Sequence, residues 1–80
     1  MKTRCIFRVF KDTGDLVALF PNEIADNSGN CMSYMKIGQH GAADYNGVMK
    51  ITKRCRASEY QDLKKELESI GYNLDVKMRR

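Results

Sequence analysis

The sequence predicts an α+β fold in which an antiparallel sheet of four to five strands carries one helix packed on one face, in the approximate order ββββαβ. Short segments with apolar residues at every second position dominate the first part of the chain, and one segment with apolar residues three and four apart follows them. The length of 80 residues limits the core to that of one small domain. We therefore expect residues 1–80 to form a single domain without a large enclosed cleft.

The first two strands are expected to form a hairpin. Residues 4–11 alternate with one fully apolar face, and residues 16–20 are apolar throughout. Between them, Gly14 provides the positive φ angle that a hairpin loop of three to five residues usually needs. Pro21 has no amide hydrogen to donate, so we expect it to end the second strand or to leave that strand at a sheet edge.

Two further strands are predicted on either side of a glycine-containing loop. After a polar loop at residues 22–30, residues 31–37 alternate in a pattern typical of a third strand. Residues 38–45 hold a Gln-His pair flanked by glycines, which predicts a shaped loop rather than a slack one. Residues 48–55 alternate again and predict a fourth strand whose polar face is strongly basic.

One helix and a last strand are predicted near the C-terminus. Ser58 and Gln61 match the S-x-x-Q capping box, which predicts that a helix begins here. Gly71 is placed to end it in a left-handed conformation, and alternation over residues 72–78 predicts a final strand with one packed face. The apolar stripe of the helix consists of Tyr60, Leu63, Leu67 and Ile70.

Composition excludes several classes of protein. Apolar residues make up 42% of the chain and charged residues 30%, as in soluble globular proteins, and no apolar run approaches the ~18 residues needed to cross a bilayer. Arg8 interrupts the first apolar segment too early for a signal peptide. The cysteines, Cys5, Cys31 and Cys55, are widely spaced, which favours reduced thiols. We therefore expect a cytoplasmic protein without membrane association.

The charge of the chain favours an anionic partner. The formal net charge is +4, and Lys50, Lys53, Arg54 and Arg56 cluster just before the predicted helix. On the sheet face away from the helix, basic side chains can pair with phosphates while aromatic rings stack on unpaired bases, so we expect single-stranded nucleic acid as the partner. The predicted site on this face consists of Arg4, Arg8, Phe10, Tyr34, Lys36, Lys50 and Arg54.

Two alternatives to this nucleic-acid site stay open. Outward positions of strands are commonly Lys, Arg or Tyr for solubility and for protection of sheet edges, so the same pattern occurs without a ligand. Alternatively, Phe10, Met32 and Tyr34 could form an exposed apolar patch for a protein partner, and free strand edges could pair in a homodimer. In each case we expect a protein that is not an enzyme.

The glycine-containing loop holds a second candidate site, which consists of Gln39, His40, Asp44 and Tyr45. His40 and Asp44 would be a base and its orienting carboxylate for a cysteine nucleophile if the fold brought them together. The cysteines and His40 would also supply a Cys₃His zinc set, although structural zinc sites usually take ligands from close pairs. Gly38 and Gly41 lack the Lys-Ser/Thr of a phosphate-binding loop. We therefore expect no catalytic residue, metal or cofactor, and thiols that pack as small apolar groups.

Four segments taken together, RCIFRVFKDTGD, ALFP, IGQHGAADY and DLKKELESIGYNL, resemble a family of small, uncharacterised single-domain bacterial proteins associated with mobile genetic elements. The resemblance spans nearly the whole chain. It implies a compact fold and an accessory role. That family has no assigned biochemical activity, so the resemblance supplies no catalytic residues for this chain.

Overall fold

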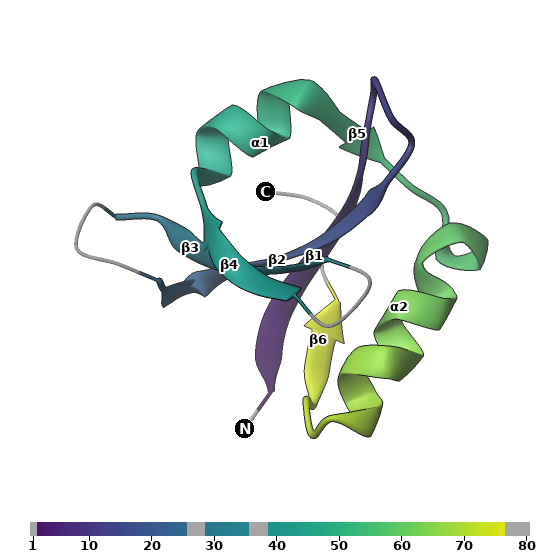
Figure 1. The fold of residues 1–80 in the computed structure, drawn as a ribbon. Coiled ribbons are helices and arrows are strands. Elements are labelled where there is room, and N and C mark those ends of the chain that lie inside the picture. Colours follow the sequence, from purple (N-terminus) through teal and green to yellow (C-terminus); the bar gives the residue numbers. More distant parts are fainter. Residues whose placement is uncertain (1, 26–28, 36–38, 77–80) are drawn as a thin grey trace.

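The structure is a computed structural model that describes residues 2–25, 29–35 and 39–76. It combines one sheet with two helices, α1 and α2, which lie against different parts of that sheet (Figure 1). In chain order, the elements are β1 (Thr3–Phe10), β2 (Leu16–Ile24), β3 (Cys31–Met35), β4 (Gln39–Ala43), α1 (Tyr45–Ile51), β5 (Thr52–Arg54), α2 (Ala57–Ser69) and β6 (Leu74–Val76).

The sheet has six strands, with the path β4-β3-β2-β1-β5, and β6 also pairs with β1. The pairs along this path are antiparallel, whereas β6 runs parallel to β1. β6 pairs with residues 3–5 of β1 and β5 with residues 8–10, so these two short strands share the outer edge of β1. The predicted α+β class with an antiparallel sheet is confirmed, but the described chain has a sixth strand and a second helix.

The hairpin between β1 and β2 forms where it was predicted. Gly14 has a φ angle of 76°, and the Phe10 N–H donates to Asp15 O at 2.8 Å across the loop. The prediction for Pro21 was wrong, because β2 continues through it to Ile24. The pairing of β2 with β3 shifts register in this segment, and an irregularity of that kind tolerates a residue that cannot donate to the ladder.

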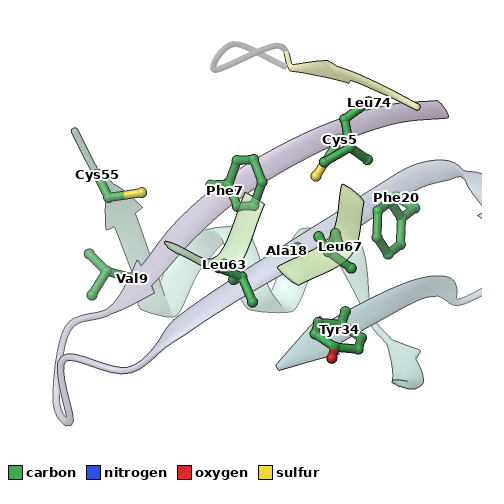
Figure 2. Packing of buried hydrophobic residues seen from close by; sticks show 10 residues of the cluster. All are labelled: Cys5, Phe7, Val9, Ala18, Phe20, Tyr34, Cys55, Leu63, Leu67 and Leu74. Carbon is green, nitrogen blue, oxygen red and sulfur yellow. The ribbon is translucent and has the colours of Figure 1, made fainter. Parts of the chain in front are cut away.

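The helix α2 covers one face of the sheet. Leu63 and Leu67 are buried there, and the half-buried Tyr60 stacks on Phe7 with ring centroids 4.4 Å apart. Ile70, which was predicted to continue this stripe, is 54% exposed. Figure 2 shows how side chains from α2, the central strands and β6 meet in this cluster. Its buried members, termed the α2 core, are Cys5, Phe7, Val9, Ala18, Phe20, Tyr34, Cys55, Leu63, Leu67 and Leu74.

The N-cap of α2 lies two residues earlier than predicted, at Arg56 instead of Ser58. The helix begins at Ala57 with Arg56 as its N-cap, and the Arg56 N–H donates to the Glu59 carboxylate at 3.3 Å. This bond is the half of a capping box that the acidic residue supplies. Ser58 therefore lies inside the first turn, and the prediction that it caps the helix was wrong.

The helix α2 ends at Ser69, and Gly71 follows its C-cap in the left-handed conformation that was predicted. The φ angle of Gly71 is 111°, in the region that favours glycine. The Gly71 N–H donates to Glu68 O at 3.1 Å, and the Tyr72 N–H donates to Leu67 O at 3.2 Å. These two bonds form a Schellman motif, which satisfies carbonyls in the last turn of the helix and turns the chain toward β6.

The opposite face of the sheet is covered by α1, a helix of 7 residues. Two predictions were therefore wrong: residues 48–55 do not form a continuous strand, and the second face of the sheet is not open. Strand structure in this region is confined to Thr52–Arg54. Tyr45, Val48 and Met49 also have the spacing of three and four that suits a helix. The cluster around them, termed the α1 core, has Val17, Leu19 and Cys31 as buried members, with Phe10, Met35, Ala43, Tyr45, Val48 and Met49 packed against them.

Hydrogen bonds from β1 hold the C-terminal end of α1. Carbonyls in the last turn of a helix have no partner within it, and an isolated helix of this length is unstable in water. Arg8, which is 9% exposed, donates from Nη2 to Met49 O at 3.3 Å and to Thr52 O at 2.7 Å. Its Nε donates to the Thr52 hydroxyl at 3.0 Å, and this hydroxyl donates to Val48 O at 2.7 Å.

Lys11, directly after β1, completes this end of α1. Its backbone N–H donates to Ile51 O at 3.1 Å, and its Nζ donates to Lys50 O at 3.3 Å. The carbonyls of residues 48–51 therefore all accept hydrogen bonds from side chains or from the backbone of Lys11. Such bonds join residues up to 44 positions apart, which explains why local alternation did not predict them.

Candidate anion-binding edge

The residues of the predicted nucleic-acid site do not share one exposed face. Arg8 is buried at the end of α1, and Phe10 packs against the α1 core. Tyr34 lies on the opposite side of the sheet, in the α2 core, where it is 3% exposed and its hydroxyl donates to the Glu66 carboxylate. The predicted stacking surface was therefore wrong, because α1 and α2 cover the two faces on which these rings lie.

The exposed apolar patch predicted for a protein partner is also absent. Met32 and Tyr34 face α2, whereas Phe10 faces α1, so these side chains belong to different clusters. Exposed isoleucines lie elsewhere, at Ile24 in β2, at Ile51 at the end of α1 and at Ile70, the C-cap of α2. They occupy separate elements.

Lys50 and Arg54 are the two members of the predicted site that the structure shows as exposed within residues 2–25, 29–35 and 39–76. Lys50 lies in the last turn of α1 and Arg54 at the end of β5, so they do not share the strand that was predicted for them. Arg4 is half-buried, and its Nε is buried without a hydrogen-bond partner. Lys36 lies outside the described residues.

Lys50 and Arg54 belong to a group of exposed cationic side chains at the outer edge of the sheet. Lys53 pairs in register with Val9 and Arg54 with Arg8. Since successive residues of a strand point to opposite faces, Lys53 and Arg54 extend positive charge to both sides of this edge. This group is termed the basic edge, and its members are Lys11, Lys50, Lys53, Arg54 and Arg56.

In the described part of the chain, no carboxylate forms an ion pair with the basic edge. The ion pair that the described residues do form joins Lys64 to Glu68 on α2, at 3.8 Å. A surface hollow of about 300 Å³ opens beside Lys11 and Lys50, with Asp12 and Ile51 completing its lining. The basic edge therefore presents cationic groups to solvent beside a shallow and mainly apolar depression.

Only part of the basic edge is evident from the sequence. The run of cations at residues 50–56 was recognised, but a continuous strand would have placed Lys53 on the face opposite to Lys50 and Arg54. Arg56 was not assigned to the site because it lies beyond the end of the predicted strand at residue 55. Lys11 was missed altogether. No local signal identifies it, because its proximity to Lys50 depends on the contact between the β1–β2 hairpin and α1.

The second candidate site is not a loop. Gln39 and His40 lie in β4, while Asp44 is the N-cap of α1 and Tyr45 its first residue. The His40 Nε2 atom lies 2.9 Å from the Tyr72 hydroxyl, so the hydrogen bond of this imidazole is made with Tyr72 and not with Asp44. The structure therefore gives no support to the base-carboxylate pair.

The thiols are buried and lie apart. Burial raises the pKa of Cys5 to about 12 and that of Cys55 to about 11, and it also raises the pKa of Cys31. These thiols are therefore protonated at neutral pH, unlike the thiolates that act as nucleophiles. Cys5 and Cys55 belong to the α2 core and Cys31 to the α1 core, on opposite sides of the sheet. The prediction of buried, separate cysteines is confirmed.

Comparison with known proteins assigns no family. No family model matches the chain, and no significant match was found among curated proteins or solved structures. The resemblance to small bacterial proteins of mobile genetic elements stays a hypothesis. Over the residues that the structure describes, no helix has the length and apolar character required to cross a membrane, and no three His, Cys, Asp or Glu side chains are grouped to hold a metal ion.

Proposed function

We propose that this protein is a non-catalytic binding domain that contacts the phosphate backbone of nucleic acid through the basic edge. The observation that carries this proposal is the gathering of exposed lysines and arginines from the β1–β2 hairpin, α1, β5 and the start of α2 on one edge of the sheet. Such side chains release counterions when they meet phosphates, which supports binding without sequence preference. The accessory role implied by the bacterial resemblance is compatible with such a domain.

Phosphate contacts, and not base stacking, are the basis of this binding. Stacking on single strands requires exposed aromatic rings, and Phe10 and Tyr34 are packed against helices. Phosphates are offered by single strands and duplexes alike. We therefore expect both forms of nucleic acid to bind, in place of the single-strand preference that the sequence suggested.

Fluorescence anisotropy with one labelled oligonucleotide, single-stranded and as a duplex, tests the proposal across a series of salt concentrations. Lys53→Ala and Arg54→Ala should each lower the slope of log affinity against log salt by about 0.7 for the single strand and about 0.9 for the duplex. Lys65→Ala is the matched control, because Lys65 is also exposed but lies on α2. No binding at low salt, or an equal loss from Lys65→Ala, would contradict the proposal.

A second candidate function, association with another protein, is favoured by one observation. The strand β4 ends the sheet on the side away from β5 and carries no charged residue.

A further inference from the structure

The two outer edges of the sheet differ in how they are protected against pairing with another strand. On one side, β5 has 3 residues and includes Lys53 and Arg54. Short length and charged side chains are the usual devices that prevent an edge strand from adding a further strand. On the other side, β4 has 5 residues, QHGAA, with no charge, no proline and no break in its register with β3.

The accessibility of β4 agrees with its position at the edge. His40, Gly41 and Ala42 are all exposed, although they lie in the middle of a paired strand. An antiparallel ladder satisfies the peptide groups on one side of such a strand and leaves those on the other side directed outward. Gly41 has no side chain and Ala42 has only a methyl group, so these peptide groups are open to an approaching backbone.

We propose that β4 is a self-association edge, where two copies of this protein join by antiparallel pairing of β4 with β4 to form one continuous sheet. The inference is independent of nucleic-acid binding, since none of the basic edge lies in β4. Pairing of exposed strand edges in this way is a recurring mode of recognition, in which the main chain supplies most of the hydrogen bonds.

The sequence of β4 permits antiparallel pairing with the β4 strand of a second copy. A two-fold axis through Gly41 places Gly41 opposite Gly41 of the second copy and His40 opposite Ala42 of that copy. Such an isologous contact pairs one patch with itself and closes at two copies. Every directly opposed pair in this register includes a glycine or an alanine, and no two like charges meet.

The distribution of charge favours a second copy at this edge over an acidic partner. An acidic partner would be attracted to the basic edge, whereas β4 offers it no cation. Two copies that each carry a net charge of +4 repel each other least where they meet at a neutral strand. With strands about 4.8 Å apart, β5 lies four steps or roughly 19 Å from β4, beyond the Debye length of about 8 Å in physiological salt.

The contact area between two β4 strands is small. One pair of five-residue strands buries less surface than stable interfaces do, and contacts below about 1,200 Å² are typical of transient complexes. The association should therefore be weak and dependent on concentration. Its detection requires measurements over a range of protein concentrations that extends to concentrated solutions.

Sedimentation equilibrium over a concentration series is the first test. The average mass of the wild-type protein should rise above 9.2 kDa toward twice that value as concentration increases, while Ala42→Lys should stay monomeric because it places a charge on the edge. Ala57→Lys is the matched control, with the same change at an exposed alanine in the first turn of α2. It should associate like the wild type. A wild type that stays monomeric throughout, or an Ala42→Lys variant that associates equally well, would overturn the proposal.

Cross-linking tests the register. Gly41→Cys should give a covalent dimer with a short bifunctional thiol reagent, whereas Ala57→Cys under the same conditions should not. A side chain fits at Gly41, because a Cβ atom there would meet nothing closer than Ser33 Oγ at 4.0 Å, and the native cysteines are buried. Circular dichroism checks that the variant is folded. A folded Gly41→Cys variant that cross-links no faster than Ala57→Cys would exclude pairing at the centre of β4.

Discussion

The two faces of this sheet are covered by helices that are held in different ways. On one face, α2 has 13 residues and packs Leu63 and Leu67 onto the strands, with no buried charge among the members of the α2 core. On the other face, α1 has 7 residues, none of them fully buried. Its C-terminal carbonyls are instead bonded by Arg8, by Lys11 and by the hydroxyl of Thr52.

This difference shows two routes by which a small domain covers a sheet. A helix of about 13 residues can present a periodic apolar stripe and gain its stability by removing that stripe from water. A helix of two turns has too little apolar surface for this. Such a helix requires hydrogen-bond partners for its unpaired carbonyls. In α1 these partners are Arg8, Lys11 and Thr52. The first route leaves a long apolar stripe in the local sequence, whereas the hydrogen bonds of the second route join residues far apart in the chain.

The largest effect is expected where the α2 face depends on apolar burial. Leu67→Ala should lower the free energy of unfolding by about 2–4 kcal/mol, since Leu67 is fully buried and its truncation leaves a cavity under the helix. Ile70→Ala is the control on the same helix end and should change it by less than about 0.5 kcal/mol, because Ile70 is 54% exposed. Urea denaturation measures both. Equal effects would mean that the stripe does not hold α2.

A smaller loss is expected for the buried guanidinium on the α1 face. Arg8→Ala should cost about 2–3 kcal/mol, because charge-assisted hydrogen bonds to Met49 O and Thr52 O disappear and those carbonyls stay partly buried. Arg54→Ala is the control, since Arg54 is the register partner of Arg8 but is exposed. Hydrogen exchange should show amides of α1 losing protection in Arg8→Ala before those of α2. Uniform loss across both helices would contradict a separate role for Arg8.

The hydroxyl that links Arg8 to α1 should contribute less than the guanidinium. Thr52→Val keeps the shape of the side chain but removes the acceptor for Arg8 Nε and the donor to Val48 O, so a loss of about 1 kcal/mol is expected. Combined with Arg8→Ala, the loss should be less than the sum of the two, because both changes disrupt one network. Strict additivity in denaturation experiments would show that the two side chains act separately.

The smallest effect is expected at the start of α2. Ser58 matches a capping motif in sequence, for which replacement by alanine costs about 1 kcal/mol, but the cap of this helix is Arg56. With Ser58 exposed inside the first turn, Ser58→Ala should change stability by less than about 0.5 kcal/mol, and in the stabilising direction because alanine is the better helix former. Thermal denaturation of this variant decides between the two positions of the cap.

The candidate sites repeat the contrast between local and distant information. Residue type and local charge density predicted that cations gather near residues 50–56, and this needed no tertiary structure. Their arrangement needed it, because residues 48–51 turn out to be helical and only Thr52–Arg54 pair with β1. The proposed stacking site failed for the same reason: Tyr34 and Arg8 lie on opposite sides of the sheet, which depends on register across strands.

By itself, the sequence determined those features whose cause is local. Alternation gave β1 and the core of β3, a continuous apolar run gave the first part of β2, the apolar stripe gave α2, and Gly14 and Gly71 gave the turns that require positive φ angles. Tertiary structure alone decided the rest. Residues 48–51 alternate well enough for a strand, yet they are helical because Arg8 and Lys11 satisfy carbonyls that a strand would have directed to a neighbour. Likewise, β4 became an edge strand because β3 offered it a complete register, and no pattern within the five residues QHGAA could have shown that.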